Sequence, residues 1–243
     1  MKIALVTGAN KGVGFETARQ LAKQGVHVLM GSRSEERGKA ATQELLKQGL
    51  PVEFIRLDME APDTFIHVRN NITEKFGILD ILVNNAGVQI ESDNWQTNTV
   101  ETIPMETLHR TFDINFFGMV ELTQLLLPLI RKSKAGRIVN VTSILGSLTY
   151  HATPGSNTYN TKTFAYNTSK AAVNSFTIHL AHALQDTNIK VNAAHPGWVK
   201  TDMGGEGATL TLEQGAATSV ALALLDENGV SGKYIHINSE FPW

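Results

Sequence analysis

The chain has 243 residues, 42% of them apolar and 18% charged, and it has no cysteine. This balance is typical of a globular protein and excludes a disordered or collagen-like chain, disulfides and thiolate metal sites. The formal net charge of −2 gives no strong field for a nucleic acid. We expect no signal peptide and no stretch of membrane-spanning length, and we predict a cytoplasmic protein without a nucleic-acid or membrane partner.

Short apolar runs alternate with longer amphipathic stretches along the whole chain. Strands are predicted at residues 3–7, 27–30, 52–57, 81–83, 137–141, 190–194 and 233–237. Helices are predicted at residues 13–24, 34–48, 62–76, 105–132, 163–184 and 212–225. This order predicts a single-domain α/β fold, a Rossmann-like doubly wound sheet of about seven parallel strands with helices on both faces and ligands at the carboxyl ends of the strands. Residues 88–102 and 148–161 are polar, and we expect loops there.

The first strand runs directly into a glycine-rich turn. Its glycines let the backbone approach a pyrophosphate, and the following helix directs its positive N-terminus at the same place. The turn therefore predicts a dinucleotide site, although glycines here could also serve close packing alone. The candidate cofactor ligands of this turn are Gly8, Asn10, Lys11, Gly12, Val13 and Gly14.

The end of the second strand indicates which dinucleotide binds. An acidic residue there would accept hydrogen bonds from the ribose of NAD, but Ser32 and Arg33 occupy the position. Arg33, with Arg37 one helical turn later and Lys11 nearby, can neutralise a 2′-phosphate, which favours NADPH over NADH. The alternative is a solvated helix start whose arginines pair with surface acids. The missing acid also disfavours an S-adenosylmethionine site.

Two further turns at the strand ends add candidate cofactor contacts. Asp58, followed by Met59, comes after the third strand and could hydrogen-bond an adenine amino group. Asn85, Ala86 and Gly87 follow the fourth strand and supply small residues beside the cofactor, unless they form a plain turn.

The candidate catalytic residues begin with Tyr166 and Lys170, whose spacing of four places them on one face of a helix. A neighbouring cation and a positive nicotinamide ring both favour phenolate, so the pair is predicted to be a tunable acid and base. Ser143 ends the fifth strand and can hold a substrate oxygen while Tyr166 moves the proton, or it can serve as a cap. Asn115 lies in an apolar helix. Its side-chain amide could hydrogen-bond to a water and to groups around Lys170, or it could be a core amide whose hydrogen bonds are all made within the protein.

Taken in order, these motifs resemble the short-chain dehydrogenase/reductase family over nearly the whole chain. The matching positions are the glycine turn, Asn84 to Gly87, Asn115, Ser143, Tyr166 with Lys170, and Pro196-Gly197 to Thr201. The resemblance implies NAD(P)(H)-dependent chemistry at a carbonyl or alcohol centre. It implies that Tyr166 is the proton donor or acceptor, Ser143 orients substrate, Lys170 binds the nicotinamide ribose and lowers the tyrosine pKa, Asn115 supports a relay water, and Val199 and Thr201 hold the carboxamide.

Within the family, the chain resembles the NADPH-dependent carbonyl reductases and their plant relatives. The resemblance rests on residues 8–12, on Arg33 with Arg37, on residues 196–203 and on the terminal Pro242-Trp243. Those reductases carry a long insertion before the tyrosine, whereas Ser143 and Tyr166 are only 23 positions apart here. We expect one NADP(H)-binding domain over residues 1–243, with a substrate loop near 148–162 and a substrate lid near 198–212. In the family the helix that bears the tyrosine commonly forms the oligomer interface, and residues 148–161 could cover or reshape it here. The sequence therefore does not decide between a monomer and a homo-oligomer.

An apolar, aromatic wall near the nicotinamide predicts a bulky hydrophobic substrate, although each of its members could instead fill the core. The wall candidates are Trp95, Leu145, Tyr150, Tyr159, Trp198, Met203 and Trp243, of which Leu145, Tyr159 and Trp198 join Ser143 as predicted substrate contacts. The histidines show no paired spacing, so we expect no metal.

The predicted function is an NADPH-dependent oxidoreductase that transfers hydride between nicotinamide and a hydrophobic ketone, aldehyde or secondary alcohol, with a small molecule as its partner. The alternative is an NADP(H)-binding regulatory protein without turnover. Sugar-nucleotide epimerisation or dehydration ranks last, since that branch usually has a longer chain and a different glycine spacing.

Overall fold

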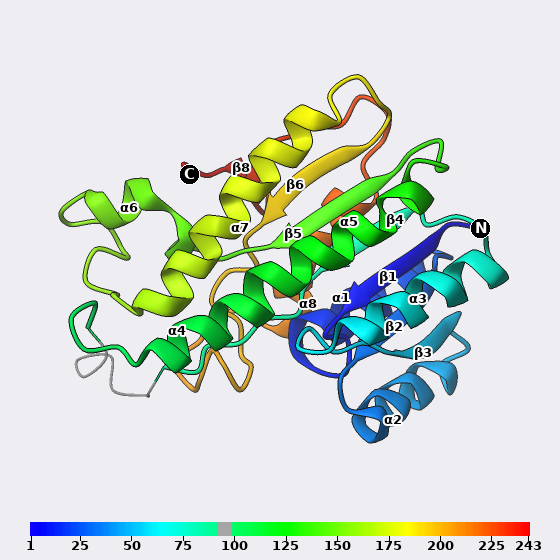
Figure 1. Ribbon diagram of the computed structural model, residues 1–243, viewed down its shortest axis with the longest axis horizontal. Helices are drawn as coiled ribbons and strands as arrows, with labels where there is room; N and C mark the ends of the chain where they lie inside the picture. Colours follow the sequence, from blue (N-terminus) through cyan, green and yellow to red (C-terminus); the bar gives the residue numbers. More distant parts are fainter. Residues whose placement is uncertain (92–98) are drawn as a thin grey trace.

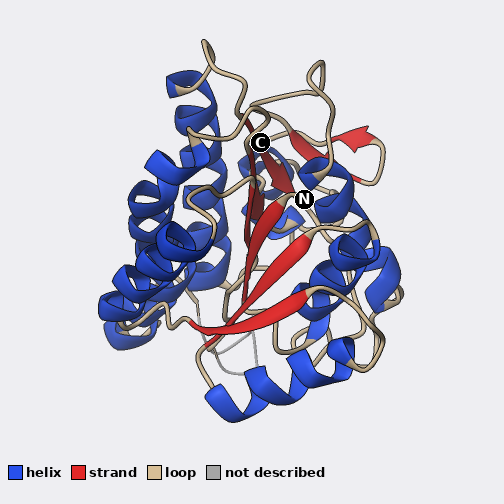
Figure 2. Ribbon diagram, turned by 90° about the vertical axis from the view of Figure 1, so that its right-hand side faces the viewer, coloured by secondary structure: helices blue, strands red, loops and turns tan. Residues whose placement is uncertain are grey.

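One eight-stranded sheet with helices on both faces organises the chain (Figures 1 and 2). The computed structural model describes residues 1–91 and 99–243. The strands are β1 Ile3–Thr7, β2 His27–Ser32, β3 Val52–Arg56, β4 Ile81–Asn84, β5 Arg137–Val141, β6 Lys190–Ala194, β7 Tyr234–His236 and β8 Ser239–Glu240. Their order in the sheet is β3-β2-β1-β4-β5-β6-β7-β8.

Helices connect almost all of these strands. They are α1 Gly12–Lys23, α2 Glu35–Leu46, α3 Pro62–Lys75, α4 Met105–Phe112, α5 Gly118–Ile130, α6 Leu148–Ala152, α7 Phe164–Ala183 and α8 Leu212–Ala223, with a π-helix η1 Asp113–Phe117 and a short 3₁₀ helix η2 Ile144–Gly146. Figure 1 shows α6 projecting from the end of the molecule away from α2.

Alternation along the strands divides the core into two layers. In β1, Ile3 and Leu5 pack with apolar residues of α3, α5 and α7 on one face of the sheet. Ala4 and Val6 pack on the other face with residues of α1, α2 and α8. Successive side chains of a strand point to opposite faces, so a strand covered on both sides is apolar throughout, as β1 is. Figure 2 shows the two helical layers flanking the sheet.

The predicted doubly wound fold is confirmed, with one addition at its edge. The seven predicted strands are present and parallel, and β8 adds an eighth strand that pairs antiparallel with β7. The turn between these two strands passes through Ile237, whose φ is +55°. The segment predicted as a loop at residues 148–161 contains α6, whose first turn is capped by the Ser147 hydroxyl accepting from the Tyr150 N–H at 3.2 Å.

The helix predicted at residues 105–132 is one continuous run with a change of winding inside it. The turn Asp113–Phe117 between α4 and α5 is π-helical, an irregularity frequent at functional sites. The run Met105–Ile130 is long and apolar enough to cross a membrane by length and composition, so our expectation that no stretch reaches that length was wrong. Half of its apolar window is buried inside the protein.

The sheet order places the candidate site. β1 and β4 are neighbours although three helices and two strands separate them in sequence, so the chain reverses direction across the sheet at this point. Ligands of such sheets bind in the crevice at the carboxyl ends of the strands near this switch. The turns that follow β1, β4, β5 and β6 all reach this edge.

Candidate active site

The glycine turn after β1 is packed against the turn after β4. The Thr7 hydroxyl accepts hydrogen bonds from the backbone N–H groups of Asn85 at 2.9 Å and Ala86 at 2.8 Å. A Cβ on Gly14 would lie 2.3 Å from Asn85 Nδ2 and 2.5 Å from the Gly8 carbonyl oxygen. Close packing is therefore a genuine reason for glycine at position 14.

The same turn also fits a dinucleotide. Gly8 and Gly12 adopt φ values of +66° and +59°, which favour glycine and keep side chains away from the turn. None of the described side chains caps the N-terminus of α1, so its first N–H groups are available to an anion. Lys11, the third cation predicted near the 2′-phosphate, forms an exposed ion pair with Asp202 at 2.5 Å and joins the turn to the segment at 198–212.

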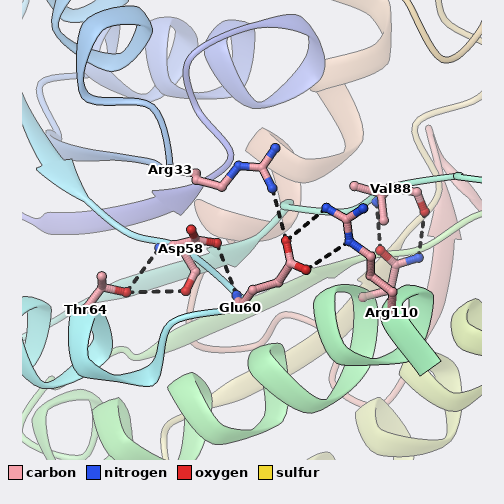
Figure 3. A network of polar contacts seen from close by, with 7 residues as sticks. Arg33, Asp58, Glu60, Thr64, Val88 and Arg110 are labelled. Atoms are coloured by element: carbon pink, nitrogen blue, oxygen red, sulfur yellow. Dashed lines mark hydrogen bonds and ion pairs between the residues drawn. The ribbon is translucent and has the colours of Figure 1, made fainter. Parts of the chain in front are cut away.

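Arg33 follows the end of β2 and points toward Glu60 (Figure 3). Its guanidinium lies 3.1 Å from Glu60, a carboxylate that also accepts from Arg110 Nε at 3.0 Å. The bond from Arg110, followed by the charge of Arg33, holds the Glu60 pKa below its ordinary value. Pairing of Arg33 with a surface acid is what the alternative expects, although the acid is Glu60 from the turn after β3. Arg33 stays 55% exposed and can meet an anion.

The neighbouring polar groups are held locally. Asp58 accepts from the Glu60 N–H at 3.1 Å through Oδ1, and its own N–H donates to the Thr64 hydroxyl (Figure 3). Ser32 is buried and donates to the Ser34 carbonyl at 3.0 Å, while Met59 is buried in the core. The Arg37 side chain is exposed in the first turn of α2.

The catalytic candidates meet between β5 and α7. Tyr166 is buried, and the Ser143 hydroxyl interacts with its phenol in the sense that favours the charged form. Burial raises the pKa of Tyr166 to about 12, against the opposite effect of the Ser143 hydroxyl. Lys170 Nζ lies 5.7 Å from the centre of the Tyr166 ring and donates to the Val141 carbonyl at 2.9 Å. Burial lowers the Lys170 pKa to about 8.

This electrostatic arrangement corrects one expectation. The sequence predicts a phenol whose pKa is lowered by Lys170, but in the protein alone the pKa of Tyr166 is raised. The reason is that desolvation of a fully buried phenolate outweighs its stabilisation by the protein. Tyr166 is thus a phenol at neutral pH.

Asn115 joins the turn after β4 to α7. Its Oδ1 accepts from the Val88 N–H at 2.7 Å, and its Nδ2 donates to the Val88 carbonyl at 2.9 Å and to the Ser169 hydroxyl at 3.0 Å. A Cβ on Gly87 would lie 3.3 Å from both Asn115 Oδ1 and Lys170 Nζ, so both groups approach the backbone there. Asn115 is a satisfied buried amide placed beside Lys170.

The segment after β6 folds back over the glycine turn. Gly197 has a φ of +84° after Pro196, Val199 is buried, and the Thr201 methyl group comes within 3.5 Å of where a Gly12 Cβ would be. Trp198 is exposed, and its indole N–H donates to the Gly204 carbonyl at 2.7 Å. The predicted lid residues therefore lie beside the predicted pyrophosphate turn.

The aromatic wall divides into two groups. Tyr150 packs against Phe241 with ring centres 6.0 Å apart, and Trp243 stacks on Tyr234 at 5.5 Å, so both half-buried rings pack against the C-terminal segment. Exposed surface remains on Tyr159, Trp198 and Met203. Leu145 is half-buried beside Ser143, whose hydroxyl accepts from its N–H at 3.2 Å. Trp95 lies outside the described residues.

Two residues of the site have no signal in the sequence. His195 Nδ1 lies 3.3 Å from the N–H groups of Ile144 and Gly197, and so links the Ser143 turn to the segment after β6. Burial lowers the His195 pKa to about 3, which keeps the ring a neutral acceptor. Glu91 accepts from two N–H groups in the first turn of α7. Each contact depends on the fold, since no local pattern connects its partners.

Comparison with known proteins agrees with this geometry. The family model described as short chain dehydrogenase matches residues 2–209. The chain is 34% identical to carbonyl reductase (NADPH) 1 of Mus musculus over 279 aligned positions, which cover 99% of this chain and 98% of the relative. Salutaridine reductase from Papaver somniferum superposes with a TM-score of 0.83 at 31% identity, covering 96% of this chain and 99% of that one. Menthone neomenthol reductase from Mentha piperita superposes with a TM-score of 0.79 at 28% identity, covering 98% of this chain and 99% of that one.

Proposed function

This chain belongs to the short-chain dehydrogenase family, and we propose that it is an NADPH-dependent reductase of hydrophobic ketones and aldehydes, able to oxidise secondary alcohols in reverse. The observation that carries the proposal is the buried Tyr166 phenol, which interacts with Ser143 and lies beside Lys170 at the edge of the sheet that also holds the glycine turn.

The residues that would hold the cofactor lie along that edge. The backbone of the glycine turn and the uncapped N-terminus of α1 suit a pyrophosphate, and Arg33 suits a 2′-phosphate. Lys170 would meet the nicotinamide ribose, with Thr201 and Val199 at the carboxamide. When bound, NADPH supplies the hydride that reduces the carbonyl carbon. The name of the Mus musculus relative supports NADPH as the cofactor.

The protein's own contribution is the proton. With a pKa of about 12, Tyr166 is protonated at neutral pH and is available to donate to a carbonyl oxygen. Ser143 orients that oxygen beside the phenol. After the transfer the phenolate faces the Ser143 hydroxyl and the Lys170 ammonium, which offset part of the cost of burying the new negative charge.

The exposed side chains near this edge support an apolar substrate. Trp198 and Met203 lie in the segment at 198–212, which we assign as the substrate lid, and Tyr159 lies in the segment at 148–162, which we assign as the substrate loop. The printed names of the relatives, carbonyl reductase, salutaridine reductase and menthone neomenthol reductase, support carbonyl reduction.

Turnover with NADPH and a panel of alicyclic and aromatic ketones and aldehydes tests the proposal. We expect NADPH consumption coupled to alcohol formation, with NADH much less effective. NADPH binding without turnover of any panel member would favour the regulatory protein instead, and failure to bind either dinucleotide would overturn the cofactor assignment.

A further inference from the structure

A buried carboxylate from a distant loop caps the helix that carries Tyr166. Glu91 is 6% exposed and belongs to the segment after β4. Its Oε1 accepts from the Ala165 N–H and its Oε2 from the Tyr166 N–H, both at 2.9 Å. The two oxygens thus satisfy two of the first N–H groups of α7, which have no partner within the helix itself.

The helix supplies no cap of its own. Thr163 occupies the N-cap position, but its hydroxyl donates to Asn167 Oδ1 at 2.8 Å and makes no capping bond. The first turn of α7 also lacks an acidic residue. Glu91 therefore replaces both the missing acceptor and the missing negative charge at the positive end of the helix.

The charge of Glu91 is balanced by this helix end. In the part of the chain that the structure describes, no basic side chain forms an ion pair with Glu91. Burying a carboxylate is unfavourable unless hydrogen bonds compensate it, and the two N–H groups of α7 supply them. The bond between Glu91 and α7 is consequently strong and well oriented.

The same loop is fixed again three residues earlier. Asn115 holds the Val88 N–H and carbonyl through both ends of its amide. The loop between Val88 and Glu91 is thus attached to η1 at one end and to α7 at the other. Tyr166 is the third residue of α7, so the Glu91 bond to its N–H locates the backbone from which the phenol projects.

We propose that Glu91 is a positioning residue for Tyr166. It acts through the backbone of α7 and holds the phenol beside Ser143 and Lys170. This inference rests on the proposed function, in which Tyr166 is the proton donor.

Three variants test the inference in the full-length protein. Glu91→Ala removes both acceptors, and Glu91→Gln keeps one acceptor oxygen and nearly the same volume. Glu213→Gln is the matched control, because Glu213 is an exposed acid in the first turn of α8. For each protein we would measure kcat for a ketone of the panel, Kd for NADPH, and the fraction of molecules that bind NADPH by nicotinamide fluorescence.

We expect kcat per NADPH-binding molecule to fall on the order of 100-fold in Glu91→Ala and about tenfold in Glu91→Gln, since small misplacements of a catalytic group have effects of this size. Kd for NADPH stays unchanged because Glu91 does not contact the glycine turn, and the Glu213→Gln control keeps both constants. Expressing kcat per binding molecule removes the contribution of unfolded protein, and Glu91→Gln gives the answer even where Glu91→Ala does not fold.

Unchanged kcat per binding molecule in Glu91→Gln would overturn the inference, as would a loss of activity that matches the loss of NADPH-binding molecules. Tyr166→Phe separates the two proposals. If Tyr166→Phe retains turnover, the proposed function fails. If Tyr166→Phe is inactive and the Glu91 variants are fully active, only the positioning role fails.

Discussion

The ammonium of Lys170 lies 5.7 Å from the centre of the Tyr166 ring, and both side chains are buried. Burial disfavours the charged form of each group, so it lowers the pKa of Lys170 to about 8 and raises that of Tyr166 to about 12. At neutral pH the pair is a phenol beside an ammonium. This is the protonation state that carbonyl reduction requires.

The Lys170 pKa predicts how stability depends on pH. Its folded-state pKa of about 8 lies below the ordinary 10.5, so the unfolded state binds more protons between these values. The free energy of unfolding of the cofactor-free protein should therefore rise as pH increases from about 8 to 10.5, by at most about 3 kcal/mol. This contribution is lost again as pH falls back to 8. Denaturant titrations across this range, compared with Lys170→Met, measure the contribution. Identical pH slopes in the two proteins would contradict it.

Arg33 is predicted to set the preference for NADPH. Arg33→Ala removes the exposed cation, and we expect Kd for NADPH to rise roughly tenfold to 100-fold while Kd for NADH changes little, as for loss of a charge-assisted hydrogen bond. Arg110→Ala is the control, because Arg110 binds the same Glu60 carboxylate from α4. An equal loss of NADPH affinity in both variants would mean that the Glu60 network, and not Arg33 itself, maintains the site.

Gly14→Ala should damage the cofactor turn through packing. Its new Cβ would lie 2.3 Å from Asn85 Nδ2 and 2.5 Å from the Gly8 carbonyl, so the two turns must separate. We expect NADPH affinity to fall at least about tenfold and the unfolding free energy to drop by about 1–3 kcal/mol. Gly49→Ala, where the new Cβ has nothing within 4 Å, should lower stability through its φ of +73° but leave Kd unchanged. Normal NADPH affinity in Gly14→Ala would contradict the packing argument.

The parts of the site that the sequence predicts are those whose geometry is local. The glycine turn is contiguous with β1, and Tyr166 and Lys170 share a helix face at a spacing of four. Ser143 could be placed because parallel strands end at one edge of a sheet. The doubly wound α/β architecture follows from the alternation of short apolar and longer amphipathic segments along the chain.

The parts that escape prediction depend on contacts between distant segments. Glu60, in the turn after β3, accepts a hydrogen bond from Arg33 after β2. Glu91, in the segment after β4, accepts one from the first turn of α7. His195 holds two turns through one ring nitrogen. The π-helical turn around Asn115 is equally invisible, because its residues also fit an ordinary α-helix. The raised pKa of Tyr166 reflects burial, which spacing alone does not reveal.

The most direct test of the proposed chemistry is NADPH consumption by wild type and Tyr166→Phe at a saturating concentration of a ketone substrate, with NADPH binding measured on both proteins. The account predicts near-normal NADPH binding and a kcat lowered by about 10²-fold to 10⁴-fold in Tyr166→Phe, the contribution of a general acid. Turnover equal to that of wild type would show that the proton comes from another group and would contradict the assignment of Tyr166.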